Sequence, residues 1–553
     1  MVRACLSAAP LALMALLPLL STGCSDLESP IFNDYIGPKA QAPDEEAPPV
    51  ELPEPIPQAT STSAPATMAD ITGQALAVSV HDAILMTLEN NKSFAVQRYS
   101  PQIRRTAIDA QRAAFDPLVA GRISTAHSRT PSQGLTRSGT ELVPGGRINW
   151  NSMDSTAGAL SLSEFLPTGT DIALTASGAA REPGSAFGDT SRVELDVTQS
   201  LLRGAGLDVN LASLRQAKLD ALASQYELRG FAEAMIAQAE QTYWNYALAL
   251  RQIELVEDSR KLALQQLSDV RERVNVGTLA EKREIPAAEA EVAQRELDLI
   301  VARANVQTTR LQLLRLLSPS LGRLWERDVT LVDPPTVPDI NLPDVENYVR
   351  VALRMRPDVN QARLQVKRGD LQVVKTRNGL LPRLDAFINL GKTGYSNSFF
   401  DSAGHIGDKG YDLTVGVSGD WSPINRAAQA ANKSAILSRD QSKAAVSNLE
   451  QLVQTDVRTA YIQVIRFKQQ VATSAVARRA QEETLRAETE KFHVGKSTSF
   501  LVAQAQRDLL SSQLAEVQAQ VNYMNAIVDL YRLDGSLLER RGIVAPGRQP
   551  VAP

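Results

Sequence analysis

Residues 411–421 read Tyr-Asp-Leu-Thr-Val-Gly-Val-Ser-Gly-Asp-Trp, and apolar and polar positions alternate along most of this stretch. Successive residues of a strand point to opposite faces, so one face carries Tyr, Leu, Val, Val, Gly and Trp. The eleven residues suit a tilted strand that crosses a membrane, which needs about 9–11 residues. Tyr411 and Trp421 at its ends are predicted to lie in the aromatic girdles of the two membrane interfaces.

Two other segments alternate in the same way, Leu384–Leu390 and Val193–Val197, and a less regular strand is expected after Pro117. Soluble sheets show the same alternation, but the terminal aromatics favour a membrane sheet. Four strands cannot close a barrel, because the smallest spanning barrels use about eight. Lipid does not tolerate open sheet edges. We therefore expect several chains to share one barrel.

An additional hairpin is predicted around Leu166-Pro167-Thr168-Gly169-Thr170, because short alternating runs flank this turn. The flanking runs are 160–162 and 172–174. The sequence leaves open whether this hairpin joins the barrel or lies outside it.

Long helices account for most of the remaining chain. Helices are expected over 80–116 and 345–381, each about 37 residues long and each ending at a proline. Two longer helices, Leu207 to Val276 and Ile424 to Val494, each extend over about 70 residues. At about 1.5 Å per residue, such a helix spans roughly 100 Å. This length suits a wall or a rod rather than a globular domain.

The chain contains an internal duplication. The segment from Val80 to Pro117 aligns without gaps on the segment from Val345 to Pro382, and Tyr243 to Gly277 aligns on Tyr461 to Gly495. The two offsets, 265 and 218 residues, differ by 47 residues, which are extra material in the first copy. Each copy is predicted to be a helix, a strand region, a long helix, a tight turn and a shorter helix.

The N-terminus reads as a secretory signal that ends in Leu20-Ser21-Thr22-Gly23-Cys24. This ending is similar to the lipobox of bacterial lipoproteins, although Leu20 is four rather than three residues before the cysteine. Cys24 is therefore the expected site of lipid attachment, and a plain secretory signal with an incidental cysteine is the alternative. Ser25 is similar to the residue found in lipoproteins sorted to the outer membrane. The following residues, 24–74, are rich in proline and are predicted to be a tether.

Composition argues against several functions. The formal net charge is −4, which gives no reason to expect nucleic acid as a partner. The four histidines are scattered without metal-ligand spacing, and no nucleophile motif is visible, so we expect no catalytic residue, metal or cofactor. Outside the N-terminus no apolar run is long enough for a membrane-spanning helix.

With these features together, the chain resembles the TolC-like outer-membrane efflux proteins over residues 75–540. The resemblance rests on the two Val-Gly turns, on a tyrosine about 34 residues before each turn, and on the ending Tyr531-Arg532-Leu533-Asp534-Gly535-Ser536-Leu537. It implies a mostly α fold with transmembrane β-strands: a trimeric helical barrel below a shared twelve-stranded β-barrel, with four strands from each chain.

The resemblance also implies site residues. The tips that dock a periplasmic membrane-fusion adaptor would be Val276, Gly277, Thr278, Val494, Gly495 and Lys496. Many family members carry acidic residues at the aperture, where this chain has Leu501 and Gln504, preceded by Phe500. We hypothesise a hydrophobic gate of Phe500 and Leu501; packing of both between neighbouring helices is the alternative. Pro286 is expected to delay or kink the returning helix.

The predicted function is an outer-membrane channel subunit, lipid-anchored and passive, that serves an inner-membrane pump of the RND or ABC type in efflux or type I secretion. The rival classes are a periplasmic coiled-coil scaffold without a pore and a secreted hydrolase with a helical stalk. The substrate stays open. The predicted organisation is a signal (1–23), a tether (24–74), a first repeat (75–317, strands 117–205), an equatorial linker (318–344), a second repeat (345–538, strands 382–422) and a tail (539–553).

Overall fold

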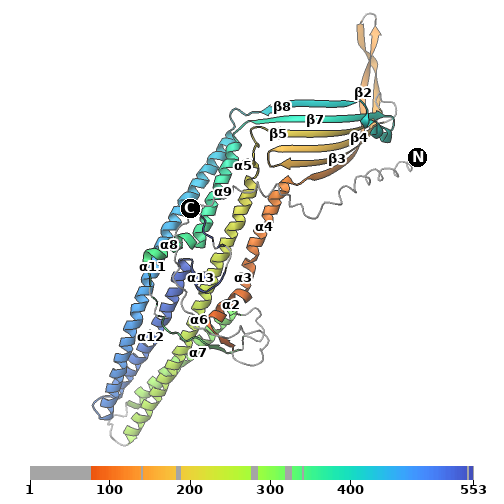
Figure 1. Cartoon of the computed structure of the whole chain (residues 1–553). Helices are drawn as coiled ribbons and strands as arrows, with labels where there is room; N and C mark the ends of the chain where they lie inside the picture. Colours follow the sequence, from red (N-terminus) through yellow and green to blue (C-terminus); the bar gives the residue numbers. More distant parts are fainter. Residues whose placement is uncertain are drawn as a thin grey trace, which may run out of the picture. The chain divides into compact units, whose positions relative to one another are not determined.

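The computed structural model describes residues 76–138, 141–181, 188–275, 284–317, 325, 327–338, 340, 342–544, 547 and 549–551. All of them belong to one compact unit, Ile56–Pro553. The fold is mostly helical, with one large sheet (Figure 1). Cys24 and Val276, Gly277 and Thr278 of the first tip lie outside the described residues.

Four helices lie side by side at two levels. The long helices α6 (Ala212–Asn275) and α11 (Arg426–His493) run through both levels. Near the sheet, α4 packs on α6, α6 on α9, and α9 on α11; farther away, α7 packs on α6, α6 on α12, and α12 on α11. The shorter helices are α2 (Val80–Asn90), α3 (Lys92–Gln97), α4 (Tyr99–Arg112), α7 (Glu284–Leu317), α8 (Val345–Met355), α9 (Pro357–Asn378) and α12 (Ser499–Leu533).

The expectation of unbroken helices over 80–116 and 345–381 was wrong. Asn91 has extended backbone (φ −67°, ψ 122°), and its side chain caps α3 by accepting hydrogen bonds from the next turn. Arg356 is likewise extended (φ −58°, ψ 126°), as a residue before proline prefers. Pro357 then begins α9. Pro286 lies in the first turn of α7, where proline is tolerated.

The large sheet has six strands in the order β2-β3-β4-β5-β7-β8. The expectation of four strands per chain was therefore wrong: the additional hairpin, β3 and β4, joins the sheet between β2 and β5. Every neighbouring pair is antiparallel. The strands are β2 (Leu118–Ser138), β3 (Glu141–Leu166), β4 (Thr170–Arg181), β5 (Asp189–Ser200), β7 (Arg383–Ser396) and β8 (Tyr411–Asp420).

Register explains why the hairpin belongs to the sheet. Leu162 of β3 lies opposite Val119 of β2 on one side and Leu174 of β4 on the other, and Leu174 lies opposite Leu195 of β5. Directly opposed residues of a sheet share a face. The alternation of the hairpin thus continues the apolar face of its neighbours.

Two packed clusters hold the helices together. One surrounds Ile236 of α6 and Tyr531 of α12, and the other surrounds Tyr243 of α6. The Tyr243 hydroxyl donates to the carbonyl of Val78, in the small parallel sheet of β1 (Leu76–Val78) and β6 (Val329–Leu331). Burial raises the pKa of Tyr243 to about 12. Among the described helices, none is both long and apolar enough to span a membrane.

Candidate channel-forming surfaces

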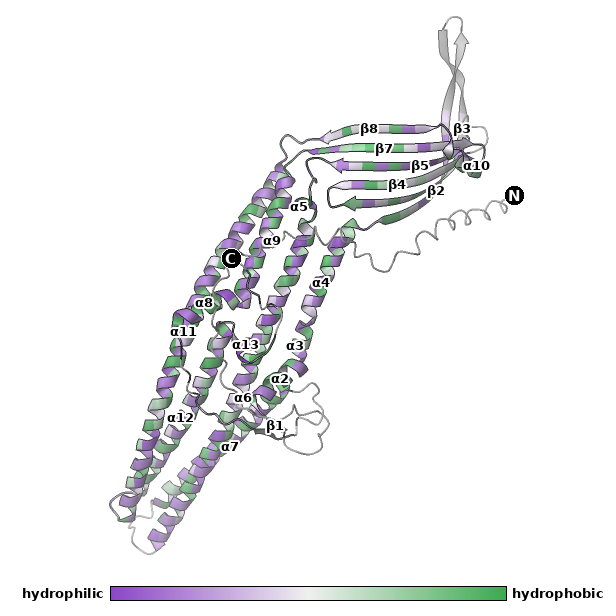
Figure 2. Ribbon diagram, in the orientation of Figure 1, coloured by the Kyte–Doolittle hydropathy of each residue, from purple (hydrophilic) through white to green (hydrophobic). Residues whose placement is uncertain are grey.

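One face of the six-stranded sheet is apolar and exposed to solvent in the single chain. Side chains from all six strands contribute to it, and Ile123 and Val415 are 86% and 66% exposed. Figure 2 shows the alternation of apolar and polar residues along these strands. The exposed members of this apolar face are Val119, Ile123, Leu160, Leu162, Leu174, Leu195, Ile388, Leu390, Tyr411, Leu413, Val415 and Val417.

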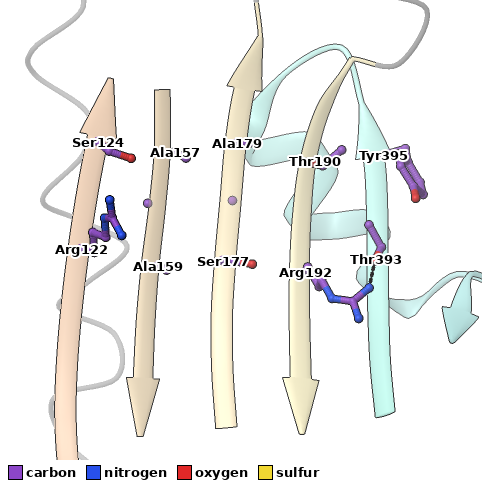
Figure 3. A pocket seen from close by; sticks show the side chains of 12 residues that line it. Arg122, Ser124, Ala157, Ala159, Ser177, Ala179, Thr190, Arg192, Thr393 and Tyr395 are labelled. Atoms are coloured by element: carbon purple, nitrogen blue, oxygen red, sulfur yellow. Dashed lines mark hydrogen bonds between the residues drawn. The ribbon is translucent and has the colours of Figure 1, made fainter. Parts of the chain in front are cut away.

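The opposite face of the sheet is polar. Arg192 of β5 donates two hydrogen bonds to the carboxylate of Asp412 on β8, at 2.8 and 2.7 Å. The same guanidinium donates to Glu194 at 3.0 Å and to the hydroxyl of Thr393 at 3.2 Å (Figure 3). The charged groups of this face therefore pair across strands.

Between Arg122 and Arg192 the polar face has a shallow hollow of about 670 Å³. Small side chains of the additional hairpin form its floor, including Ala157 and Ala159 of β3 and Ala179 of β4 (Figure 3). The hollow is open to solvent, and no buried charged group points into it from the described residues. It is a part of the polar surface rather than a binding pocket.

The predicted girdle aromatics lie at the two ends of β8. Tyr411 begins the strand, Trp421 directly follows it, and both side chains are exposed. The sequence did not reveal α10 (Phe399–Gly404), which adds Phe399 and Phe400 near the end of the sheet where Tyr411 lies. A pair of adjacent phenylalanines in the β7–β8 connection was the only signal for it.

α10 packs on the apolar face through small residues. The hydroxyl of Ser402 lies 2.7 Å from that of Ser191 on β5. The ring of Phe399 covers Gly178 of β4 so closely that a β-carbon there would collide with it, and Gly394 of β7 has the same relation to the backbone of Ser402. Three small residues, Gly178, Ser191 and Gly394, thus form the surface on which α10 packs, which we call its seat.

The described tip lies between α11 and α12. Gly495 has a φ of 76°, and its N–H donates to Phe492 while that of Lys496 donates to Lys491. This pair of bonds is the Schellman arrangement that ends many helices at glycine. Thr498 then caps α12 by accepting from the Leu501 N–H. Val494, Gly495 and Lys496 are all exposed, so the turn presents them outward.

The three predicted aperture residues are exposed on the first turns of α12. Phe500 lies beside α6 and α7, in a small groove that also contains Ala287 and Arg507. Leu501 and Gln504 do not line this groove. Of the two residues of the hypothesised gate, only Phe500 thus lines this groove, and both side chains are exposed in the single chain.

Polar contacts join the two helical hairpins close to their tips. Gln266 of α6 donates to the carbonyl of Ser499 at 2.7 Å. Arg273 donates to the carbonyl of Phe492 at 2.7 Å, and its guanidinium lies over the ring. Arg507 of α12 pairs with Glu291 of α7 at 2.8 Å. The described parts of the two hairpins are therefore held together near the ends of α6 and α11.

The sequence matches a known family over its second half. Residues 349–536 match the family model described as outer membrane efflux protein. These residues, about a third of the chain, are similar to this family. No curated protein matches the sequence significantly.

Solved structures show the same fold as this chain. The outer membrane channel CmeC of Campylobacter jejuni is 15% identical, with a TM-score of 0.60 over 83% of this chain and 86% of CmeC. The open state of the MtrE outer membrane channel of Neisseria gonorrhoeae is 18% identical, with a TM-score of 0.59 over 83% and 89%. VceC of Vibrio cholerae, an outer membrane protein, is 15% identical, with a TM-score of 0.56 over 82% and 96%.

The family match supports an outer-membrane efflux role for this chain, and the solved structures show its fold. The family is one of channel proteins and not of enzymes. In the described part of the chain, no group of three or more histidine, cysteine, aspartate or glutamate side chains could hold a metal ion.

The predicted C-terminal tail contributes a strap, residues 537–544, 547 and 549–551, that contacts α6 and α9; the sequence did not predict these contacts. Arg229 of α6 is buried and pairs with Glu233 and with Glu539 of the strap, at 3.0 and 2.7 Å. The Val551 N–H donates to Asn360 of α9 at 2.8 Å. The strap therefore ties helices from the two halves of the chain.

The family-like ending at 531–537 has a structural explanation in this region. Gly535 has a φ of 71°, and its carbonyl accepts a hydrogen bond from Arg229 at 3.0 Å. Asp534 is completely buried and accepts from the Ser536 N–H at 2.8 Å. Burial raises the pKa of Asp534 to about 7. These residues turn the chain from α12 into the strap.

Proposed function

We propose that three copies of this efflux protein form a passive outer-membrane channel, which receives substrates from an inner-membrane pump through a periplasmic adaptor. The observation that carries the proposal is the sheet with one exposed apolar face and one polar face. In a closed barrel, lipid covers the apolar face and water fills the inside, which is the arrangement of membrane β-barrels.

Both edges of the sheet support assembly with further copies. In the described residues β2 pairs only with β3, and β8 pairs only with β7. Five successive antiparallel pairings leave β2 and β8 running in opposite directions. The β8 edge of one copy can therefore pair with the β2 edge of the next in the same antiparallel pattern. Repeating this head-to-tail contact closes a ring.

The helices carry matching apolar stripes on the same two sides. On the β2 side, α3 and α4 expose Val96, Tyr99 and Ile103, and α7 exposes Leu297, Ile300 and Val301. On the β8 side, α11 exposes Leu437, Leu452, Ile462 and Val476. Exposed apolar side chains that recur along one side of a helix favour contact with another protein surface. Both sets would be buried in a ring of copies.

The proposal includes two attachment sites. Cys24 would carry the lipid anchor in the outer membrane, which its lipobox-like context favours. The tips at Val276-Gly277-Thr278 and Val494-Gly495-Lys496 would dock the adaptor. The exposure of Val494 and Lys496 on a glycine-terminated turn supports the second tip as a contact surface. Phe500, Leu501 and Gln504 would lie near the aperture.

A matched pair of variants in planar bilayers tests the channel. Val415 of the apolar face and Thr414 of the polar face are neighbours on β8. A lysine on the lipid side costs about 2–4 kcal/mol near the membrane centre. We expect Val415→Lys to abolish assembly in the outer membrane, whereas Thr414→Lys assembles and conducts with altered ion selectivity. A native oligomer that never conducts would overturn the channel and favour a periplasmic scaffold.

A further inference from the structure

We infer that each copy contributes six strands to the barrel, so that a trimer closes eighteen strands rather than twelve. This inference rests on the proposed channel. It begins with the position of the additional hairpin, which lies inside the sheet and is hydrogen-bonded on both sides. β3 pairs with β2 over a longer stretch than it pairs with β4. β4 in turn pairs with β5 from Thr170 to Ala179.

The widths of the two layers support this strand number. Helix axes pack about 8–10 Å apart, so four helices abreast span about 32–40 Å of circumference. A strand spacing of about 4.8 Å at a tilt of about 35–45° gives about 35–41 Å for six strands. Four strands would give only about 23–27 Å. Six strands therefore span the same arc as the helices below them, and the wall need not narrow at the membrane.

The number of strands determines the width of the pore. Eighteen such strands have a circumference that corresponds to a diameter of roughly 34–39 Å between backbones, whereas twelve give roughly 22–26 Å. Barrels of 16–18 strands leave an aqueous channel of their own. The membrane part would then admit larger solutes than a twelve-stranded barrel does.

The side chains of the additional hairpin keep this space open. On the polar face, β3 carries Ala157, Ala159 and Ser161, and β4 carries Ala173, Ser177 and Ala179. Their small volumes produce the hollow between Arg122 and Arg192. A hairpin that served to fill the lumen would carry large side chains at these positions. Small ones instead widen the circumference without obstructing the interior.

Register allows the hairpin to be removed without disturbing the faces of the sheet. Ser124 lies opposite Ala157, Ala157 opposite Ala179, and Ala179 opposite Thr190. Replacing residues 127–187 with Asn-Gly, which favours a two-residue hairpin turn, would place Ser124 directly opposite Thr190. This variant has four strands per copy. It places Val119 directly opposite Leu195, and both residues stay on the apolar face.

A second deletion provides the matched control. Beyond Ala126 and Ser155, β2 and β3 pair only with each other and project past the other strands (Figure 1). Replacing residues 129–152 with Asn-Gly removes most of this projection and keeps all six strands. Both variants thus lose the projecting segment, but only the first loses two strands of the barrel.

The experiment measures polymer exclusion in planar bilayers and counts strands in electron cryo-microscopy of the full-length trimer. We expect eighteen strands, an equal size limit for the wild type and the control, and a clearly smaller limit for the four-stranded variant. Twelve strands in the full-length trimer would overturn the inference while the channel stands. The strand count uses the full-length protein. It therefore tests the inference even if the four-stranded variant does not fold. Failure of the full-length oligomer to conduct would instead refute the proposed function.

Discussion

Arg229 is the residue of the helical region whose burial depends most on its hydrogen-bond partners. Its guanidinium is almost completely buried and reaches two carboxylates and the carbonyl of Gly535. A buried charge is tolerated only when its hydrogen-bonding groups are satisfied. Arg229 therefore makes the position of the strap depend on α6, and the position of α6 depend on the strap.

Replacing Arg229 with alanine should lower stability strongly, because it leaves Glu233 and Glu539 buried without their partner. We expect a loss of about 3–5 kcal/mol in the free energy of unfolding, seen as a lower thermal midpoint in detergent. Arg251 is the control, since it makes only an exposed pair with Glu254. Its alanine variant should change stability by less than about 0.5 kcal/mol. Equal effects of the two substitutions would contradict the role of the buried pair.

Asp534 makes stability depend on pH. Its pKa rises from an ordinary value of 3.8 to about 7 on folding, because burial disfavours the charged carboxylate. The folded chain therefore holds this proton more tightly than the unfolded chain. Its contribution is complete below pH 4 and is lost as the pH rises through 7. The Arg540 guanidinium, 3.8 Å from the carboxyl, opposes this increase in the pKa but does not cancel it.

We expect the thermal midpoint of the wild type to fall between pH 5 and pH 8, through a change of a few kcal/mol in stability. Asp534→Asn should remove only the part of this dependence that Asp534 contributes, since the amide stays neutral over the whole range, whereas Glu233, whose pKa burial raises to about 8, keeps its own contribution. Scanning calorimetry of both proteins at the two pH values measures the difference. An unchanged pH dependence in the variant would exclude Asp534 as its source.

At the scale of elements, α10 shows how small residues position a larger structure. Its seat consists of Gly178, Ser191 and Gly394, which belong to three different strands. Phe399 and Phe400 extend from this seat at the end of the sheet where the predicted girdle residue Tyr411 lies. The seat therefore sets the position of both rings along the strands.

Gly178→Ala should displace α10, because the new β-carbon would collide with the ring of Phe399. Overpacking of this kind costs about 1–3 kcal/mol. We expect faster amide hydrogen exchange over residues 399–404 in the variant. Gly407 faces open space, so Gly407→Ala should leave the exchange rates there unchanged. If Gly178→Ala also leaves them unchanged, the seat does not hold the helix.

The sequence predicted where helices and strands occur. It did not predict how many strands the sheet has or where the helices are interrupted. Alternation in residues 411–421 and the lengths of the two long helices were readable, because both depend on local periodicity. The break at Asn91 was not, because a capping asparagine within a helical pattern looks like any polar residue. The place of the additional hairpin was not readable either, since strand order depends on pairing between distant segments.

The candidate site shows the same limits. The ends of β8 at Tyr411 and Trp421 and the turn at Gly495 were predictable, since local residue pattern determines them; their girdle and docking roles stay predictions. The groove that Phe500 lines depends on how α6 and α7 pack against α12. The strap depends on pairs such as Arg229 and Glu539, which are 310 residues apart. No local pattern in the sequence contains either relation.

At the scale of the whole molecule, the exposed stripe on α11 should decide assembly. Ile462 is 62% exposed in the single chain. An aspartate there would be buried without a partner in the ring, which is costly. We expect Ile462→Asp to yield monomers in native mass spectrometry, and Ile462→Leu, which keeps an apolar side chain, to yield trimers. A trimeric aspartate variant would show that this stripe lies outside the interface.

The pairing of β5 with β7 has a further consequence for biogenesis. It joins residues such as Asp196 and Asn389, which are separated by α6, α7 and α9, and contacts between such distant segments form slowly. β2 to β5 can form as a local meander much earlier. Until β7 arrives, that meander exposes an apolar face and an unpaired edge, which invites aggregation. Newly secreted chains should therefore depend on a periplasmic chaperone that shields the early meander before insertion.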